Sequence, residues 1–188
     1  YFDPDYPPRL QQIASAPAVL WVRGTAPAGN SAAVVGTRHP TRAGVDRVHK
    51  VVSVLVSAGY GIVSGLAAGV DTAAHEAALA EGGQTWAYLA SGVDYPTPRE
   101  NVDLAERIVA AGGGLLAEVD PETKPSPRTL VARDRLQSGT SSLTVIGQSG
   151  IPSGTLHTAR FTIEQERNLV VVAPPPSEAD DPAWAGNR

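Results

Sequence analysis

The segment of residues 61–83, "GIVSGLAAGVDTAAHEAALAEGG", decides the fold class of this chain. An apolar run ends in Ser64 and Gly65, a loop of small residues follows, and an alanine-rich stretch from Asp71 onward has the composition of a helix. A short apolar run without polar alternation is typical of a strand that is buried on both faces of a parallel sheet. The glycine loop has the form of a phosphate cradle, because small residues let the backbone approach an anion at a helix N-terminus.

The same alternation of strand and helix continues on both sides of this segment. Strands are expected at residues 32–36, 60–65, 85–91, 114–118, 142–147 and 169–173, with helices at 42–59, 71–83, 101–113 and 153–168. The first helix has an apolar face and ends at Gly59, where a left-handed cap belongs. The pattern predicts an α/β fold with a doubly wound, mainly parallel sheet in a single domain.

Three regions are expected along the chain. Residues 1–30 are rich in proline and aromatic side chains and are predicted to form an N-terminal arm packed on the core. Residues 31–173 hold the sheet, and residues 174–188 form a C-terminal tail. Because the tail begins with consecutive prolines, it cannot extend a sheet and is expected to wrap the surface. Methionine is absent even from position 1, which indicates a piece of a longer protein.

Composition excludes several classes of function. With no cysteine among 188 residues, disulfides, thiolate metal sites and a cysteine nucleophile are not available. The histidines show no metal-ligand spacing, so no metal site is predicted. No apolar run reaches the ~20 residues of a membrane span and no leader is visible, so a cytoplasmic protein without membrane contact is expected. The net charge of -4 argues against coating duplex DNA by bulk charge.

Glycines, hydroxyl-bearing residues and arginines follow several of the predicted strands. In open parallel sheets, ligands bind beyond the carboxyl ends of the strands, so these residues should meet in one crevice. Amides at helix N-termini, hydroxyls and guanidinium groups together suit phosphate. The candidate phosphate-binding residues are Gly36, Thr37, Arg38, Ser64, Gly65, Gly69, Arg133, Arg135, Ser153, Gly154 and Thr155.

The arginines of this set differ in what their spacing predicts. Arg38 follows the first strand directly and can reach across the mouth of the crevice as a fork-shaped phosphate partner. Arg133 and Arg135 are two residues apart, so on a helix they diverge and only one of them need face the crevice.

The two common nucleotide-binding signatures are absent from the sequence. No G-x-x-x-x-G-K-[ST] motif occurs, so no lysine is placed to reach terminal phosphates as in a Walker-type ATPase. The first turn reads "GTRHP" at residues 36–40 instead of G-x-G-x-x-G, and no carboxylate follows the second strand to bind a ribose. A nicotinamide dehydrogenase is therefore disfavoured.

Two acidic residues near strand ends have competing interpretations. Asp71 stands where a helix N-cap is expected, and it is also a candidate pocket residue. His75 lies four residues further on, so an Asp–His pair is geometrically possible, but no G-x-S-x-G elbow accompanies it. Asp94 follows the third strand and is a candidate pocket residue only. No catalytic residue and no cofactor are predicted.

Four blocks of the sequence carry a resemblance to a known family. They are "AAVVGTRHPTRAG", "GIVSGLAAGVDTAAHEAAL", "GVDYPTPRENVDLAERI" and "SGTLHTARFTIEQERNLVVV". In this order they resemble the DNA-processing protein A family, also called Smf, and "YPPRLQQIASAPAVLWVRG" resembles the segment before that family's nucleotide-binding-like domain. The resemblance covers nearly the whole chain and implies an extended Rossmann-like fold.

The resemblance also implies a function. Members of this family bind single-stranded DNA, help to load a RecA-type recombinase onto it, chiefly in natural transformation, and commonly form homodimers. Carried over by position, the family's glycine-serine-arginine turn falls on residues 36–38, its second loop on 64–71 and its late helix start on 153–155.

The chain departs from the family in one basic segment. Members usually read R-N-R followed by an apolar pair, whereas residues 133–137 here read "RDRLQ". Asp134 therefore replaces the asparagine, and Gln137 replaces one residue of the apolar pair. An added carboxylate near phosphate is unfavourable unless it faces away.

A second class of function stays open, namely a nucleotide-binding sensor or a nucleoside-monophosphate hydrolase of related fold. Those hydrolases resemble one another in a P-G-G-x-G-T motif with a glutamate close behind. Here "IPSGTLHTARFTIE" keeps Gly154 and Thr155 but has no acid before Glu164, which disfavours hydrolysis and not binding. Single-strand binders usually add stacking aromatics, for which Tyr95 is the best placed.

Overall fold

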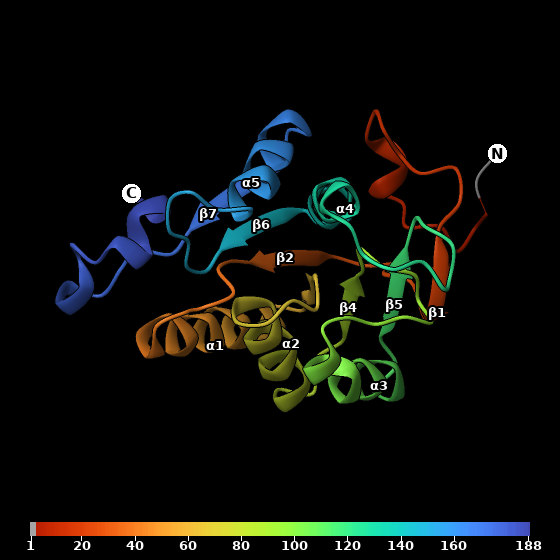
Figure 1. Ribbon diagram of the computed structural model, residues 1–188. Helices are drawn as coiled ribbons and strands as arrows, with labels where there is room; N and C mark the ends of the chain where they lie inside the picture. Colours follow the sequence, from red (N-terminus) through yellow and green to blue (C-terminus); the bar gives the residue numbers. More distant parts are fainter. Residues whose placement is uncertain (1–2) are drawn as a thin grey trace.

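The chain folds around one twisted sheet (Figure 1), seen in a computed structural model that describes residues 3–188. Within these residues the strands are β1 (Trp21–Gly24), β2 (Ser31–Val35), β3 (Gly61–Ser64), β4 (Thr85–Tyr88), β5 (Gly114–Ala117), β6 (Leu143–Ile146) and β7 (Asn168–Val171). Their order across the sheet is β1-β5-β4-β3-β2-β6-β7. Neighbouring strands are parallel except for β1 and β5. The predicted doubly wound, mainly parallel α/β fold is confirmed.

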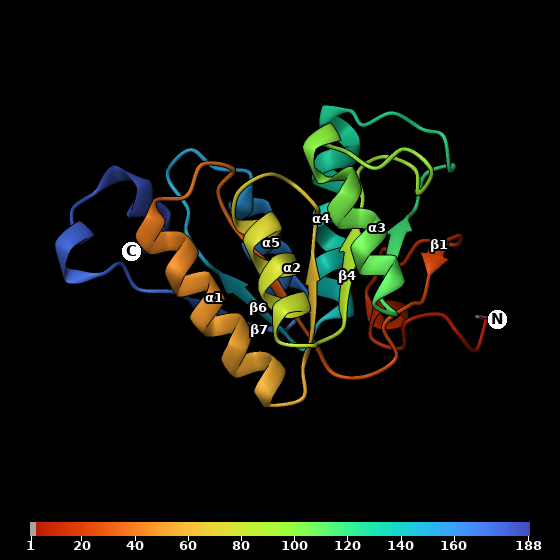
Figure 2. The same ribbon diagram turned by 90° about the horizontal axis from the view of Figure 1, so that it is seen from below.

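Helices cover both faces of the sheet. They are α1 (Arg42–Ser57), α2 (Val70–Ala80), α3 (Val102–Ala110), α4 (Pro127–Thr140) and α5 (Thr155–Glu164). Figures 1 and 2 show α1, α2 and α3 on one face, with α4 and α5 on the other. The central strands are buried along their whole length, which explains why they read as apolar runs. Among residues 3–188, no helix has the length and apolar composition of a membrane span.

The six predicted strands are all present, and β1 is an additional one. It pairs antiparallel with β5, with Val22 opposite Leu116, and forms one edge of the sheet. Its four residues are mostly exposed and directly follow the proline-rich segment, so they were included in the predicted arm and not assigned to a strand. The predicted arm therefore contributes to the sheet, although its residues 1 and 2 lie outside the described residues. The division of the chain at residues 30 and 173 stays a prediction.

Local sequence signals set the ends of α1. The Thr41 hydroxyl accepts a hydrogen bond from the Gly44 amide at 3.1 Å and caps the helix start. Gly59 has φ +81 just beyond the helix end, which confirms the predicted left-handed cap. Val48 and Val52 are fully buried against the sheet.

The basic segment that the sequence did not assign to an element is helix α4. Ser126 and Thr129 form a capping box, and Pro127 occupies the first turn. The helix has no plain apolar stripe because polar side chains, among them Arg133 and Gln137, are buried along it. Its pattern of burial therefore could not be read from hydropathy alone.

The C-terminal tail is part of the core and does more than wrap the surface. Trp184 is fully buried in a cluster with Val48 and Val52 of α1. Asn187 accepts a hydrogen bond from the Ser149 amide at 2.6 Å and donates one to the Val172 carbonyl at 2.9 Å. In Figure 1 the tail lies beside α1 and the ends of β6 and β7. The expectation of a surface wrapping was incomplete, because proline prevents strand pairing but does not prevent burial.

Candidate phosphate-binding crevice

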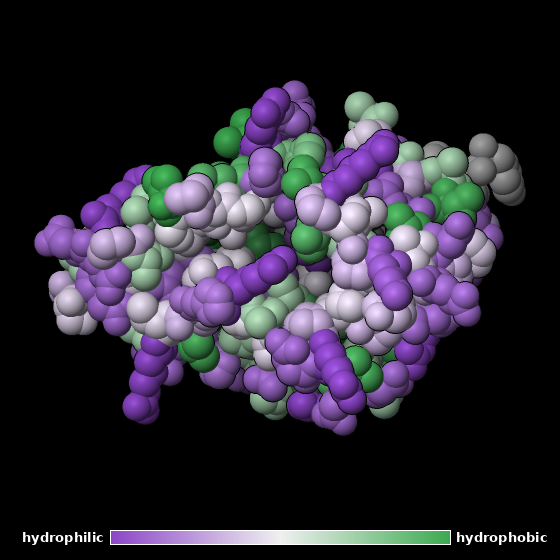
Figure 3. Space-filling model, in the orientation of Figure 1, coloured by the Kyte–Doolittle hydropathy of each residue, from purple (hydrophilic) through white to green (hydrophobic). Residues whose placement is uncertain are grey.

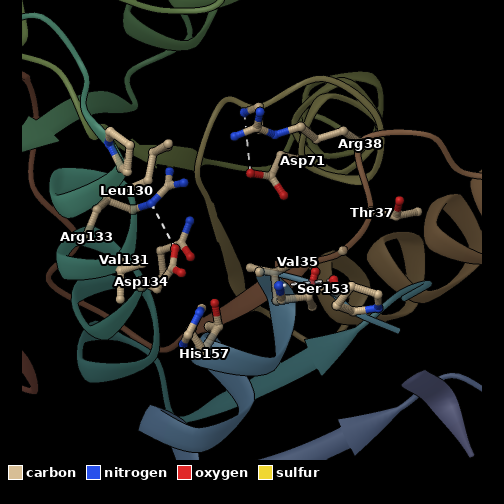
Figure 4. Close-up of a pocket in the computed structure, with 18 of the residues that line it drawn as sticks. Val35, Thr37, Arg38, Asp71, Leu130, Val131, Arg133, Asp134, Ser153 and His157 are labelled. Carbon is tan, nitrogen blue, oxygen red and sulfur yellow. Dashed lines mark hydrogen bonds and ion pairs between the residues drawn. The ribbon is translucent and has the colours of Figure 1, made fainter. Parts of the chain in front are cut away.

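A crevice of about 470 Å³ lies at the topological switch point of the sheet. There β2 has β3 on one side and β6 on the other, so the loops beyond their carboxyl ends diverge. The walls come from the loop after β2, the start of α2, one face of α4 and the start of α5 (Figure 4). Figure 3 shows a hollow near the middle of this face, flanked by hydrophilic side chains. The volume is typical of a site for a small ligand.

Most of the predicted site residues do meet in this crevice. The residues brought together are Gly36, Thr37, Arg38, Asp71, Arg133, Ser153, Gly154 and Thr155. Gly65 lines an adjoining hollow of about 440 Å³, which shares Arg38 and Arg133 with the crevice. Ser64 and Gly69 lie behind the wall, while Arg135 and Asp94 line neither hollow.

The loop after β2 is held tightly between two neighbouring segments. The Thr37 amide donates to the Gln148 carbonyl at 2.7 Å, and the Thr37 carbonyl accepts from the Val70 amide at 3.1 Å. A Cβ on Gly36 would lie 2.6 Å from both the Gln148 carbonyl oxygen and a Val70 methyl group. Only glycine therefore fits at this position, and the loop presents a fixed backbone to the crevice.

Arg38 places a guanidinium group at the crevice. Its side chain is exposed, and no residue between 3 and 188 forms an ion pair with it. Figure 4 shows it extending from the loop after β2 across the mouth, on the opposite side from His157. A guanidinium group without a protein partner keeps all its donors available for a phosphate.

The start of α5 forms the wall opposite α2. The Ser153 hydroxyl accepts a hydrogen bond from the Thr155 amide at 3.2 Å, at the first turn of the helix. Thr155 is 8% exposed and Thr158 is 2% exposed, and both line the crevice. The amino end of the helix, with Ser153, Gly154 and Thr155, therefore lies at the crevice, and phosphate binding by these residues stays a prediction.

Ser64 and Gly69 support the crevice from behind. The Ser64 hydroxyl is fully buried and donates to the Val34 carbonyl at 2.7 Å, so it is not available to a ligand. Gly69 has φ +85, and a Cβ there would lie 2.5 Å from the Thr37 carbonyl oxygen. Its role is to let the start of α2 lie against the loop that carries Arg38.

Asp71 lines the crevice but does not cap α2 as predicted. The helix begins at Val70, and Gly69 occupies the cap position with no side-chain hydrogen bond. One oxygen of the Asp71 carboxylate instead accepts from the amides of Gly65 and Ala67, at 3.1 and 3.3 Å. Burial raises the pKa of Asp71, opposed by the Arg133 charge. The carboxylate thus fixes the glycine loop that precedes it.

The possible Asp–His pair does not form. His75 is fully buried, and its Nδ1 lies 2.7 Å from the Thr85 hydroxyl. Burial lowers the pKa of His75 to about 3, so the imidazole is neutral. Although His75 lies one helical turn from Asp71, it belongs to the core beneath α2.

Arg133 faces the crevice, yet most of its donors are already used. Its Nη1 donates to the carbonyl oxygens of Gly65 and Tyr88, at 2.7 and 2.6 Å. Its Nε donates to the Asp134 carboxylate at 3.2 Å, and its side chain is 8% exposed. Arg133 therefore ties α4 to the ends of β3 and β4. This structural role differs from the role of phosphate ligand that the sequence suggested.

Arg135 and Asp94 are corrections to the predicted site. Arg135 points away from the crevice and forms a two-pronged ion pair with Glu118, with Nη1 and Nη2 at 2.7 and 2.5 Å from the carboxylate oxygens. Its Nε donates to Ser15 of the N-terminal arm. Asp94 is exposed in a loop where its amide donates to Pro121. The divergence of Arg133 and Arg135 follows from their spacing on a helix.

Several residues of the crevice were missed from the sequence. They are His39, Leu130, Val131, Gln137 and His157. Leu130, Asp134 and Gln137 repeat at the spacing of one helical face, and this spacing was the available signal. It could be used only if residues 127–140 were recognised as a helix.

Asp134 is predicted to make stability depend on pH. Burial raises its pKa from 3.8 to about 6, although Arg133 opposes the shift. The folded state therefore holds this proton more tightly than the unfolded chain, and the stability gained from protonation is lost as pH rises from about 4 to about 6. Asp134→Asn should raise the free energy of unfolding by about 1–3 kcal/mol at pH 7.5 and leave it nearly unchanged at pH 4.

Urea unfolding at both pH values measures this effect. Asp180→Asn, at an exposed position of the tail, is the matched control and should change stability little at either pH. A stabilisation by Asp134→Asn that is equal at pH 4 and pH 7.5 would contradict the assignment.

Fold and crevice together define a Rossmann-like α/β domain with a polar site at its switch point. The family model described as DNA recombination-mediator protein A matches residues 1–188, and the chain belongs to this family. The resemblance to DNA-processing protein A that the sequence blocks indicated is thereby confirmed.

Individual relatives are similar to this chain over only part of their own length. Protein Smf of Synechocystis sp. is 38% identical over 173 residues, which make up 89% of this chain and 43% of that protein. The chain spans about half the length of the curated relatives it matches.

Two solved structures share the fold closely. The X-ray structure of DNA processing protein A from Streptococcus pneumoniae matches with a TM-score of 0.88 and 31% identity, covering 98% of this chain and 64% of that one. DNA processing protein A from Helicobacter pylori matches with a TM-score of 0.83 and 26% identity, covering 96% and 82%. The Helicobacter structure concerns the single-stranded DNA binding mode of that protein.

Proposed function

We propose that this chain is the single-stranded DNA-binding domain of a DNA recombination-mediator protein, and that its crevice holds phosphates of the strand. The observation that carries the proposal is Arg38, an exposed cation without an ion-pair partner among residues 3–188, at the mouth of a crevice walled by glycines and hydroxyls. The single-stranded DNA binding of the Helicobacter relative supports it.

In this proposal different groups of the crevice contact different parts of the DNA strand. Arg38 contacts a phosphate through two donors, and the start of α5 offers hydroxyls and the positive end of its dipole. Tyr95, which is 42% exposed with the Lys124 ammonium 5.9 Å from its ring centroid, is a candidate for stacking on a base nearby. Arg133 contributes its charge from below while holding the backbone.

Arg38→Ala is predicted to weaken binding of fluorescein-labelled oligo-dT by about tenfold, because a charge-assisted phosphate contact is lost. The slope of log affinity against log salt should fall by about one, since one fewer counterion is released. Fluorescence anisotropy titrations at several salt concentrations measure both quantities. Thermal unfolding should be unchanged, because the Arg38 side chain is exposed.

Arg107→Ala is the matched control, since it removes the same charge from an exposed position on α3 that does not line the crevice. Its affinity should stay close to that of the unaltered chain. Tight, saturable binding of a mononucleotide without any binding of oligo-dT would overturn the proposal.

That outcome would favour the second candidate function, a nucleotide-binding sensor. The size of the crevice, about 470 Å³, supports this candidate because it suits a single nucleotide. A hydrolase is less well supported. Glu164 stands at the far end of α5, exposed and paired with Arg160 at 2.7 Å, and it does not line the crevice.

The proposal extends to partners and place of action. Loading of a RecA-type recombinase onto the bound strand, in natural transformation, follows from the family resemblance and stays a prediction. The cytoplasmic location expected from the sequence also stays a prediction. A homodimer has support from the edge of the sheet. Within residues 3–188, β7 pairs only with β6, and Val170 and Val171 are 47% and 42% exposed along it. A second copy could pair there about a two-fold axis.

The dimer is tested at α5, which lies beside β7. Ile163 is 64% exposed, and Ile163→Lys should weaken self-association at least about tenfold by placing a charge in an apolar contact. Sedimentation velocity over a range of concentrations measures the dissociation constant. Val54→Lys on α1, where the valine is 68% exposed, is the matched control and should leave association unchanged. A monomer at every concentration of the unaltered chain would refute the dimer.

A further inference from the structure

The floor of the crevice holds polar groups that the phosphate-binding role does not use. Gln137 lines the crevice and is 1% exposed, and its Nε2 is buried with no hydrogen-bond partner among residues 3–188. Asp134 also lines it, and within the described part of the chain one of its oxygens is engaged, by the Arg133 Nε at 3.2 Å. The two side chains are three residues apart on α4, so they are neighbours on one helical face.

A buried amide without a partner is unfavourable, and native structures seldom retain one without a reason. Arg133 cannot satisfy Gln137, because both groups are hydrogen-bond donors at this point. The Nε2 atom lies near Gly65, at the end of β3, where a Cβ would come within 2.6 Å of it. A ligand atom that accepts a hydrogen bond would give the Gln137 Nε2 atom the partner that it lacks.

The charge at the floor excludes phosphate from this place. Asp71 from α2 and Asp134 from α4 both face the crevice, and Arg133 is the cation between them. A phosphate beside two carboxylates would be repelled, whereas near Arg38 and the start of α5 it would be attracted. The rim therefore suits the phosphate, and the floor suits an uncharged polar group attached to it.

The apolar side chains beside the floor favour a flat ligand group there. Leu130 and Val131 of α4 line the same crevice (Figure 4), and so does Pro152 before α5. Apolar walls with a few convergent polar groups are typical of sites that hold a small molecule and fix its orientation. A nucleobase combines an apolar face with hydrogen-bonding groups on its edge.

We propose that the crevice floor selects a nucleobase that carries an exocyclic amine beside a ring acceptor, as cytosine and adenine do. The Asp134 carboxylate accepts from the amine, and the Gln137 amide donates to the adjacent ring acceptor. Uracil and thymine present the reverse pattern, a carbonyl beside a ring N–H, and would set their carbonyl against the carboxylate. This inference rests on the proposed single-strand binding and adds a base preference to it.

Oligo-dC and oligo-dU of eight nucleotides are the matched ligands, because they differ only in the groups in question. Fluorescence anisotropy at pH 8 should show oligo-dC binding about tenfold more tightly than oligo-dU. Equal affinities for the two would overturn the base selection and leave single-strand binding intact. Binding of neither would overturn both proposals, so the two failures are distinguishable.

Two variants assign the preference to its residues. Asp134→Asn and Gln137→Met should each bring the ratio of the two affinities close to one, mainly by weakening oligo-dC. The ratio compares two ligands on the same folded protein, so a change in stability does not alter it. A ratio that stays near ten in both variants would show that other groups make the selection and would overturn the assignment.

The pH dependence of the affinity ratio is a further test, because a purely structural role of Asp134 would leave this ratio unchanged. The selection needs an ionised Asp134, whose pKa burial raises to about 6, so the ratio should shrink as pH falls from 8 to 5. In Asp134→Asn the ratio should not change over this range. The charged groups that act on Asp134 are Arg133 on its own helix, Asp71 on α2 and His157 on α5. His157→Gln should retain the pH dependence, and its loss in that variant would instead implicate the imidazole.

Discussion

Trp184→Ala is expected to lower the free energy of unfolding by about 3–5 kcal/mol, the range for removing a large aromatic side chain from a packed core. Trp184 is fully buried against α1 and the sheet, although it belongs to the C-terminal tail. Its indole also donates to Glu178 at 2.7 Å, and that carboxylate accepts from the Thr41 hydroxyl at 2.8 Å. The substitution therefore leaves a cavity and removes one partner of a partly buried link to the start of α1.

Urea denaturation, followed by far-ultraviolet circular dichroism, measures this loss. Asp180→Ala, at an exposed position of the same tail, is the control and should change stability by less than about 0.5 kcal/mol. If Trp184→Ala were as stable as the control, the tail would be only loosely associated in solution. The core would then end before the tail, as the sequence first suggested.

Arg133→Met is expected to destabilise the chain by about 3–5 kcal/mol, because breaking a buried charge network leaves its partners without compensation. The carbonyl oxygens of Gly65 and Tyr88 would lose a donor, and Asp71 and Asp134 would lose the nearby cation. Methionine keeps most of the volume, so the loss reports on charge and hydrogen bonding. The measurement is again the free energy of unfolding in urea.

Arg135→Met is the matched control on the same helix. Its ion pair with Glu118 is partly exposed, with side-chain exposures of 15% and 22%, so a loss of about 1 kcal/mol is expected. An Arg133→Met protein of unchanged stability that no longer binds oligo-dT would contradict the structural role. Arg133 would then be a phosphate ligand, as its position in the sequence suggested.

Much of the fold could be predicted because its signals are local. The apolar runs of β2 to β7 and the caps at Thr41 and Gly59 act within a few residues of the chain. The order of strands was not predicted, because β6 pairs with β2 and not with β5, the strand before it in the sequence. β1 was missed because its four residues directly follow the proline-rich segment and were included in the predicted arm.

The candidate site was predictable only in part. The loop of Gly36, Thr37 and Arg38 was placed correctly, because its position at a strand end determines where it lies. Asp71 was assigned to a cap from sequence spacing, whereas in the structure its carboxylate accepts from the amides of the loop before it. The polar floor at Gln137 was missed because α4 shows no apolar periodicity.

The sequence by itself determined the family, the parallel α/β architecture and the glycine turn that carries Arg38. These depend on backbone conformation and hydropathy over short stretches. Only the tertiary structure decided that Arg133 is tied to Gly65, which is 68 positions away, while Arg38 has no ion-pair partner among residues 3–188. It alone placed Trp184 in the core and Asp134 at the crevice floor. The physical reason is that burial and hydrogen-bond partners come from residues distant in sequence, so identical side chains acquire different roles.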